Sequence, residues 1–375
     1  MTAFSRLTCA LTLLGIAAWV YAGPPQVTGN GPVRLEVPVP DNEPPVDHQQ
    51  PVRSNGAKSN GGDRNAVAVA LPDDAVDAKQ APGIVSNGPS EPRSAAAELK
   101  RTREQLQKCS SISAKVVERI EILEKSYKAE GRYLQTALKP NDWHMRLELV
   151  VKLGKSEGAL LEVCDGEVLW TRIEIDQGGK QDKKAPKDLS LTRRNISEIM
   201  SAARKLGDAK TEKDLIVALG LGGLPALIAA IEQDMKFGET TEGTLRERPV
   251  SVIHGTWTDA FAQKLRGPQQ QQQAQGPPSL LPAFVPDAVR IYVDRETGFP
   301  HRIMYLKKLV GREVHKPMVT LDFLDVVLNG PINNKDFDYQ PPDGVTPVEQ
   351  TKAIVDQLTP PETKGPPGGS PPRAP

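Results

Sequence analysis

The side chains that could carry out chemistry are few in this sequence and do not group into a recognisable site. The five histidines (His48, His144, His254, His301 and His315) show no spacing typical of metal ligands. The motifs of serine hydrolases, zinc proteases, phosphate-binding loops and dinucleotide-binding folds are absent from the sequence. We therefore predict a protein that is not an enzyme and that holds no metal and no cofactor.

Two short motifs look like sites of chemistry but have simpler interpretations. Asp165 precedes Gly166, and an Asp-Gly pair between apolar runs is typical of the turn of a β-hairpin. Gly220, Gly222 and Gly223 resemble a glycine-rich phosphate loop, but no Lys-Ser or Lys-Thr pair follows them. We interpret Asp165 as a turn residue and the three glycines as a hinge, because glycine adopts backbone angles that other residues avoid.

The N-terminus has the features of a secretory signal peptide. Arg6 supplies the positive charge, residues 7–20 are apolar, and Ala22 is the small residue at the cut site. The apolar run of about 14 residues is shorter than the roughly 20 that span a bilayer. We predict cleavage after residue 22, with retention as a membrane anchor as the alternative. The protein is thus expected to be exported, to the periplasm or the cell envelope.

Export makes a disulfide chemically permissible for the two cysteines outside that segment. Cys109 and Cys164 are these two residues. The alternative is that both are small buried apolar residues. Neither lies in a CxxC arrangement, so the sequence does not indicate redox catalysis.

Composition divides the remaining chain into a folded body and two tails. Residues 23–94 are rich in Pro and Gly and contain no aromatic residue, and residues 351–375 are again rich in Pro. We predict that both are disordered, because such segments cannot build a core. Residues 95–350 form the folded domain, with a glutamine-rich surface loop at 266–282. The 47 basic and 47 acidic residues cancel, which argues against a nucleic-acid partner.

Hydrophobic periodicity predicts an α+β fold for the folded domain. Ser94 can cap a helix over 95–108, and apolar residues alternate with charged ones over 145–153, as in a half-buried strand. The connections are short, so the sheet is expected to be antiparallel. Further strands are predicted at 127–138, 160–163, 168–175, 289–293, 302–306 and 319–327.

The middle of the domain is helical in pattern and strongly apolar. Helices are predicted at 195–206 and 211–237, the second broken at the three glycines. A helix pair that is apolar on several faces must bury them. The helices either complete a closed core or cover a ligand cavity, and the pattern leaves both open.

Three segments, in this order, resemble the periplasmic lipoprotein-carrier family (LolA-like). Residues 138–145 resemble its basic-Pro turn into a strand, residues 163–170 its DGxxLW hairpin, and residues 337–345 its closing FxFxPPxGV motif. The resemblance covers about 95–350. It implies a half-open antiparallel β-barrel with a helical lid, here at about 190–237, over an apolar cavity for acyl chains.

The resemblance also implies a function and a set of site residues. In the family an Arg before the Pro helps to hold the lid closed; Lys139 stands there in this chain and lacks the planar guanidinium fork. The lid hinge would be Gly220, Gly222 and Gly223. The residues implied to line the cavity and lid are Tyr133, Met145, Leu147, Leu149, Trp170, Leu215, Leu219, Leu224, Leu227 and Ile228.

We accordingly expect a monomeric, non-enzymatic binding protein that holds the acyl chains of a lipid or lipidated protein and carries them across the envelope. An envelope membrane is a further expected partner. The alternative is a sensor, regulatory or structural module of the envelope that uses the same fold without transport.

Overall fold

The computed structural model describes residues 94–122, 125–137, 143–153, 156–176, 188–265, 281–282, 285–309 and 314–358. All of them belong to one compact unit. The predicted signal peptide and most of the predicted linker at 23–94 lie outside the described residues. Among the helices of the described residues, none is both long and apolar enough to cross a membrane.

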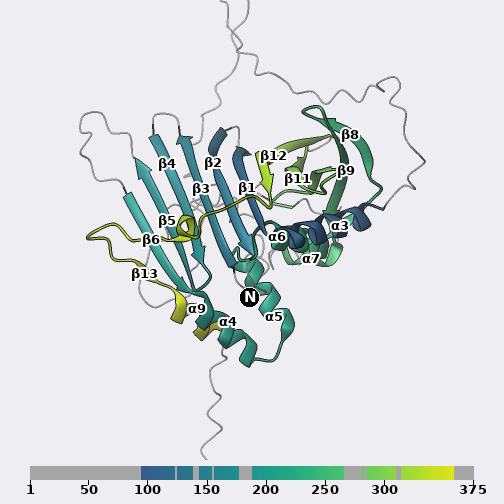
Figure 1. Ribbon diagram of the computed structural model, residues 1–375. Helices are drawn as coiled ribbons and strands as arrows, with labels where there is room; N and C mark the ends of the chain where they lie inside the picture. Colours follow the sequence, from purple (N-terminus) through teal and green to yellow (C-terminus); the bar gives the residue numbers. More distant parts are fainter. Residues whose placement is uncertain are drawn as a thin grey trace, which may run out of the picture. The chain divides into compact units, whose positions relative to one another are not determined.

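One large sheet dominates the described residues (Figure 1). Its strand order is β13-β6-β5-β4-β3-β2-β1-β12-β11-β10-β9-β7, with β8 pairing β9. Every pair is antiparallel except β13 with β6. The strands are β1 Ser111–Ile122, β2 Lys125–Ala137, β3 Trp143–Leu153, β4 Ser156–Asp165, β5 Val168–Asp176, β6 Asp188–Asn195, β7 Met235–Phe237, β8 Thr241–Leu245, β9 Arg248–Trp257, β10 Ala288–Asp294, β11 Pro300–Lys308, β12 His315–Leu328 and β13 Val348–Glu349.

The predicted α+β class is confirmed, while the sheet is mixed and not closed, with β13 and β7 at the two ends of its strand order. The purely antiparallel sheet was wrong because the two-residue strand β13 pairs parallel to β6. The predicted hairpin turn at Asp165 and Gly166 is present: Asp165 Oδ1 accepts hydrogen bonds from the N–H groups of Glu167 and Val168, at 2.9 and 2.7 Å. Gly166 has a positive φ of 95°, which suits glycine.

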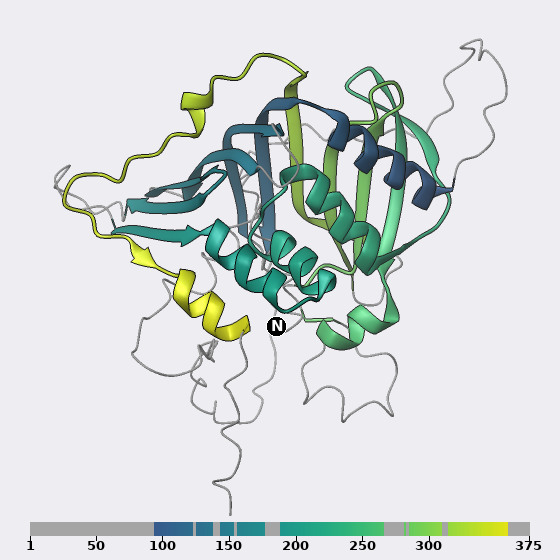
Figure 2. The same cartoon turned by 60° about the horizontal axis from the view of Figure 1, so that its bottom comes forward.

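The helices form two groups. Helices α3 (Ala95–Lys108) and α6 (Gly223–Asp234) lie side by side over one face of the sheet (Figure 2), and Arg103 Nε contacts Glu232 Oε2 between them at 2.7 Å. The short helix α7 (Asp259–Leu265) contributes Phe261 and Leu265 to the same core. The second group consists of α4 (Ile196–Lys205), α5 (Ala209–Ala218) and α9 (Thr351–Leu358), which share a separate apolar cluster.

The predicted start of α3 is confirmed. Ser94 has an extended backbone, and its Oγ accepts a hydrogen bond from the N–H of Ala97 at 3.3 Å. The cap satisfies one of the free N–H groups in the first turn of the helix. The apolar face of α3 is then buried through Leu99 and Leu106.

The predicted helical segment was wrong at both ends. Residues 190–195 continue the sheet as part of β6, which pairs with β5 along its length, and residues 235–237 form β7 against β9. The segment 196–234 contains three helices, as the predicted gap between 206 and 211 and the predicted break at the glycines imply, and turns at 206–208 and 219–222 separate them. Of the glutamine-rich loop predicted at 266–282, only residues 281 and 282 are described; they form neither helix nor strand, and Leu281 is buried in the main core.

The predicted disordered tail at 351–375 was wrong for its first eight residues. They form helix α9, and Thr351 at its start is buried. Thr351 Oγ1 accepts a hydrogen bond from the N–H of Asn195 at 2.7 Å, and Arg193 contacts Glu349 at 2.7 Å. The domain therefore extends to residue 358, because its C-terminal segment pairs with β6. The tail from 359 onward lies outside the described residues.

Candidate functional site

The candidate site is the apolar interface between the sheet and helices α3 and α6. Opposed residues of an antiparallel pair point to the same face of a sheet. Tyr133 of β2 is paired with Ala114 of β1 and Leu147 of β3, so these three share one face. All three are buried, and they belong to one core cluster with the buried side of α6.

Helix α6 supplies the other half of this interface. Its first buried turn begins at Gly223, and Leu224, Leu227 and Ile228 are buried in the same cluster as β2 and β3. Spacings of three and four residues place these side chains on one face of the helix. The apolar face of α6 is therefore matched to the apolar face of the sheet.

Two polar side chains of β2 hold the start of α6. The Tyr133 hydroxyl accepts a hydrogen bond from the N–H of Leu224 at 3.1 Å and donates one to Gln135 Oε1 at 2.5 Å. Gln135 Nε2 in turn donates to the carbonyl of Gly222 at 3.3 Å. Gly222 has no side chain to cap the helix, so the tyrosine satisfies an N–H that the helix leaves open. Burial raises the pKa of Tyr133, which keeps the hydroxyl protonated.

Gly223 is required for this contact. Its φ is 55°, and a Cβ added there would lie 2.0 Å from the Tyr133 hydroxyl and 2.3 Å from Gln135 Oε1. Gly220 and Gly222 also have positive φ, of 68° and 80°. The glycines thus let the chain turn tightly from α5 into α6, against the sheet.

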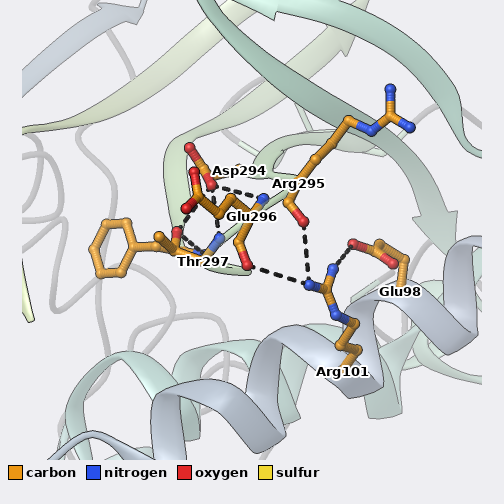
Figure 3. A network of polar contacts seen from close by, with 7 residues as sticks. Glu98, Arg101, Asp294, Arg295, Glu296 and Thr297 are labelled. Atoms are coloured by element: carbon orange, nitrogen blue, oxygen red, sulfur yellow. Dashed lines mark hydrogen bonds and ion pairs between the residues drawn. The ribbon is translucent and has the colours of Figure 1, made fainter. Parts of the chain in front are cut away.

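A second set of polar contacts fixes α3 to the turn between β10 and β11 (Figure 3). Arg101 of α3 donates to Glu98 Oε1 at 2.8 Å and to the carbonyl of Arg295 at 3.1 Å, in the turn between β10 and β11. Asp294 shapes that turn by accepting from the N–H groups of Glu296 and Thr297, at 3.0 and 2.8 Å. Helix α3 is therefore held by a turn, whereas α6 is held by a strand.

One acidic residue lies on the same apolar face. Glu118 of β1 is paired with Ala129 of β2 and Leu321 of β12, and it is fully buried. Within the described residues neither of its carboxyl oxygens has a hydrogen-bond partner. Burial raises its pKa to about 8, so the neutral form is favoured at pH 7.

Glu162 of β4 is a second buried acidic residue of this face, paired with Leu147 and Thr171. Burial raises its pKa to about 7, while the charge of Arg194 and a hydrogen bond with Thr171 lower it. Glu162 therefore has partners of its own, in contrast to Glu118.

The structure divides the predicted site residues among three clusters. One cluster, around α6, contains seven of them: Tyr133, Met145, Leu147, Leu149, Leu224, Leu227 and Ile228. Leu215 and Leu219 belong instead to the cluster of α4, α5 and α9, beside Leu169. That separation follows from the turn at 219–222, which ends α5 before the chain reaches the sheet.

Trp170 was placed on the wrong face of the sheet. It is paired with Val163, which is paired with Arg146, and the alternation of β3 puts Arg146 on the face opposite Met145 and Leu147. There Trp170 packs against Tyr339, with ring centroids 5.4 Å apart. The segment after β12 therefore covers the back of the sheet, and Trp170 lies beneath it.

The disulfide that the sequence permits between Cys109 and Cys164 is not formed. Cys109 and Cys164 are both thiols. Cys109 ends α3 and packs against the main core, whereas Cys164 lies in β4 within the cluster of α4 and α5. Lys139, the predicted lid latch, lies outside the described residues. Within those residues no group of three or more His, Cys, Asp or Glu side chains is placed to hold a metal ion.

Sequence reasoning missed Gln135 and Glu118. Gln135 had no signal, because its role depends on where α6 begins. For Glu118 the sequence does contain a signal. It interrupts the apolar face of a strand on which Ala114, Val116 and Ile120 alternate with residues of the other face. An acidic residue at an apolar position of a strand is a detectable departure from the pattern.

No family model and no curated protein matches the chain. Solved structures do, including that of the Pseudomonas aeruginosa MucA/MucB complex, at 13% identity and a TM-score of 0.33, over 66% of this chain and 61% of that one. The chain thus spans about three fifths of that structure's length. Mycobacterium tuberculosis lipoprotein LppX matches at 12% identity and a TM-score of 0.29, over 65% of this chain and 98% of LppX.

A domain assigned to outer membrane lipoprotein sorting, from Vibrio parahaemolyticus, matches at 8% identity and a TM-score of 0.25, over 65% of this chain and 95% of that domain. Identities and scores this low carry no activity or partner over to this chain. This lipoprotein-sorting domain is one of the structures to which the chain is similar.

Proposed function

We propose that this protein is an exported, non-enzymatic binding protein that holds an acyl chain of a lipid or lipidated protein between the sheet and helix α6, which acts as a lid. The observation that carries the proposal is the way α6 is attached. Its apolar face covers an apolar sheet face, and its first turn is held by Tyr133 and Gln135 beside glycines of positive φ.

A chain that enters this interface must displace α6, because Leu224, Leu227 and Ile228 are buried against the sheet. The displaced side chains would then pack against the ligand, so little apolar burial is lost. Each buried methylene of the ligand gains about 0.8 kcal/mol. A chain of ordinary length therefore offsets the cost of ordering it and of opening the lid.

Carriage across the envelope is the role we favour for such binding. A sensor, regulatory or structural module of the envelope would use the same interface without releasing its ligand to an acceptor membrane. The two roles share the acyl-binding step, which is tested first.

The test uses the full chain, a fluorescent fatty acid and two matched variants. Leu227→Asp places a charge at the sheet-facing side of α6 and is expected to weaken probe binding at least tenfold. Leu206→Asp makes the same change at a side chain that is 41% exposed, after α4, and is expected to leave binding unchanged. Circular dichroism checks that both variants fold, and Leu227→Ala replaces Leu227→Asp if the latter does not.

Mass spectrometry of organic extracts of the purified protein gives an independent measurement. We expect a lipid to be recovered with the wild-type protein. If no lipid is recovered and the wild type binds no acyl probe, α6 is an ordinary core helix and the proposal is wrong.

A further inference from the structure

Glu118 has a position that packing alone does not explain. It lies in the middle of β1, the strand that joins the two halves of the sheet, and it points to the face that α3 and α6 cover. Its neighbours along that face are Val116 and Ile120, and it is as buried as they are. An apolar residue of similar size would fit the alternation of the strand without desolvating a carboxyl group.

The carboxyl group lacks the partners that buried acidic residues normally have. Neither oxygen has a hydrogen-bond partner in the part of the chain that the structure describes. Buried polar groups in folded proteins are nearly always hydrogen-bonded, since a group left unpaired destabilises the fold. Glu162 follows this rule through Thr171 and Arg194, so burial of a carboxyl on this face does not by itself exclude partners.

The strand beside Glu118 presents small residues. The residue opposite it on β2 is Ala129, and Gly131 follows on the same face, opposite Val116. Gly131 has a separate reason to be glycine, because a Cβ there would lie 1.7 Å from the Glu148 carbonyl oxygen of β3. Ala129 alone then leaves the carboxyl of Glu118 flanked by a methyl group on that side. The β2 residue directly opposite Glu118 therefore contributes only a methyl group, and the large side chains of this face of β2, Tyr127 and Tyr133, lie further along the strand.

We propose that Glu118 binds the polar end of the acyl ligand by a hydrogen bond, and that the ligand class is an acyl chain with an uncharged, carbonyl-bearing head group such as an ester, an amide or a protonated carboxylic acid. This inference rests on the proposed function, because it assigns the polar end of a ligand whose chain lies beneath α6.

The chemistry of the site favours an uncharged head group. A neutral carboxyl both donates a hydrogen bond to a carbonyl oxygen and accepts one from an N–H or O–H group. Burial keeps Glu118 neutral at pH 7, and the residues around it are apolar. An alkylammonium ligand would require Glu118 to ionise in this environment, which the surrounding residues disfavour.

The experiment measures the binding of three ligands of one chain length to the full chain: a fatty-acid methyl ester, the matching alkane and the matching alkylamine. Displacement of a fluorescent apolar probe reports each affinity. Wild type is expected to bind the ester about tenfold more tightly than the alkane, the size of one net hydrogen bond. The alkylamine is expected to bind no better than the alkane.

Three variants assign this preference to Glu118. Glu118→Leu is expected to bind ester and alkane equally, because it removes the hydrogen-bonding group but keeps the volume. Glu118→Gln is expected to retain the preference, since its amide also donates and accepts. Glu162→Gln serves as the control for a buried carboxyl on the same sheet face and is expected to behave as wild type. Thermal unfolding confirms that each variant folds.

Two outcomes overturn the inference and leave the proposed function intact: an unchanged ester preference in Glu118→Leu, or tightest binding of the alkylamine by wild type. Binding of none of the three ligands by wild type would instead contradict the proposed function itself.

Discussion

Two buried carboxyl groups lie at neighbouring positions of the sheet but on opposite faces, and they differ in their hydrogen-bond partners. Glu118 of β1 is paired with Leu321 of β12, and the next pair along the ladder joins Val117 to Asp322. Successive residues of a strand point to opposite faces, so Glu118 faces the helices and Asp322 faces the other side of the sheet. Both are 0% exposed.

Asp322 is surrounded by arginines. Arg302 binds both of its oxygens, at 2.6 and 3.2 Å, Arg119 binds Oδ2 at 2.7 Å, and Arg246 binds Oδ1 at 2.9 Å. Burial would raise the pKa of Asp322, but the hydrogen bonds and charges of these arginines hold it below its ordinary value. Glu118 has no such partner among the described residues, and its pKa rises to about 8.

The comparison shows that hydrogen-bond and charge partners, rather than burial alone, decide whether a buried carboxyl group is ionised. Asp322 is ionised and joins β1, β11, β12 and the turn between β8 and β9. It acts as a structural cross-link. Glu118 is neutral and stabilises none of the described elements by a hydrogen bond. It is the group that we propose binds the polar end of the ligand.

The largest expected effect comes from removing the cross-link. Asp322→Ala leaves Arg302 buried without its carboxylate and is expected to lower the free energy of unfolding by about 3–5 kcal/mol. Urea unfolding measures the change. Glu242→Ala serves as the control, since Glu242 is 74% exposed and pairs with the half-exposed Arg295, so its loss should cost under about 1 kcal/mol. Similar losses in both variants would contradict the role given to Asp322.

The local parts of this architecture could be predicted from the sequence. Helix α3 begins at a serine cap, and the hairpin between β4 and β5 turns at Asp165 and Gly166, so in both cases the signal and the structure lie within a few residues. The alternation over 145–153 likewise identified the buried face of β3.

The parts that were missed depend on residues distant in sequence. Residues 190–195 read as the start of a helix but are held as a strand by β5 on one side and β13 on the other. The correct face of Trp170 depended on a segment that follows β12, including Tyr339. Glu118 was overlooked because the strand that carries it was not predicted.

The second prediction concerns pH and sharpens the contrast between the two carboxyls. Folded Glu118 keeps its proton up to about pH 8, whereas an unfolded glutamate releases it near pH 4.3. Between these values the folded state binds more protons, so the stability from Glu118 is complete below about pH 4.3 and is lost as pH rises towards 8. The contribution of Asp322 to stability changes with pH in the opposite direction. It is complete above the ordinary pKa of aspartate and is lost as pH falls below that value.

Glu118→Gln isolates this dependence, because it removes one titrating group and leaves Glu162 and Asp322 in place. One proton corresponds to about 1.4 kcal/mol per pH unit. From pH 5 to pH 7, wild type is therefore expected to lose roughly 2–3 kcal/mol more stability than the variant does. Urea unfolding at the two pH values provides the measurement. Parallel pH profiles would show that Glu118 does not hold a proton in the folded state.

The smallest effects are expected at the outer arginines of the cross-link. Arg119 and Arg246 have side chains that are 47% and 39% exposed, and each makes one contact with Asp322, whereas Arg302 makes two and is buried. Arg119→Gln and Arg246→Gln are each expected to cost about 0.5–1 kcal/mol, because water screens half-exposed pairs and can replace the lost donor.

The double variant is expected to cost more than the sum, since the first loss leaves the second arginine as the remaining partner of Asp322 besides Arg302. Urea unfolding of both single variants and the double variant measures this coupling, with Arg248→Gln as a control at a 61% exposed side chain that starts β9. Strict additivity would mean that Arg302 alone neutralises Asp322, and the contrast with Glu118 would then rest on a single arginine.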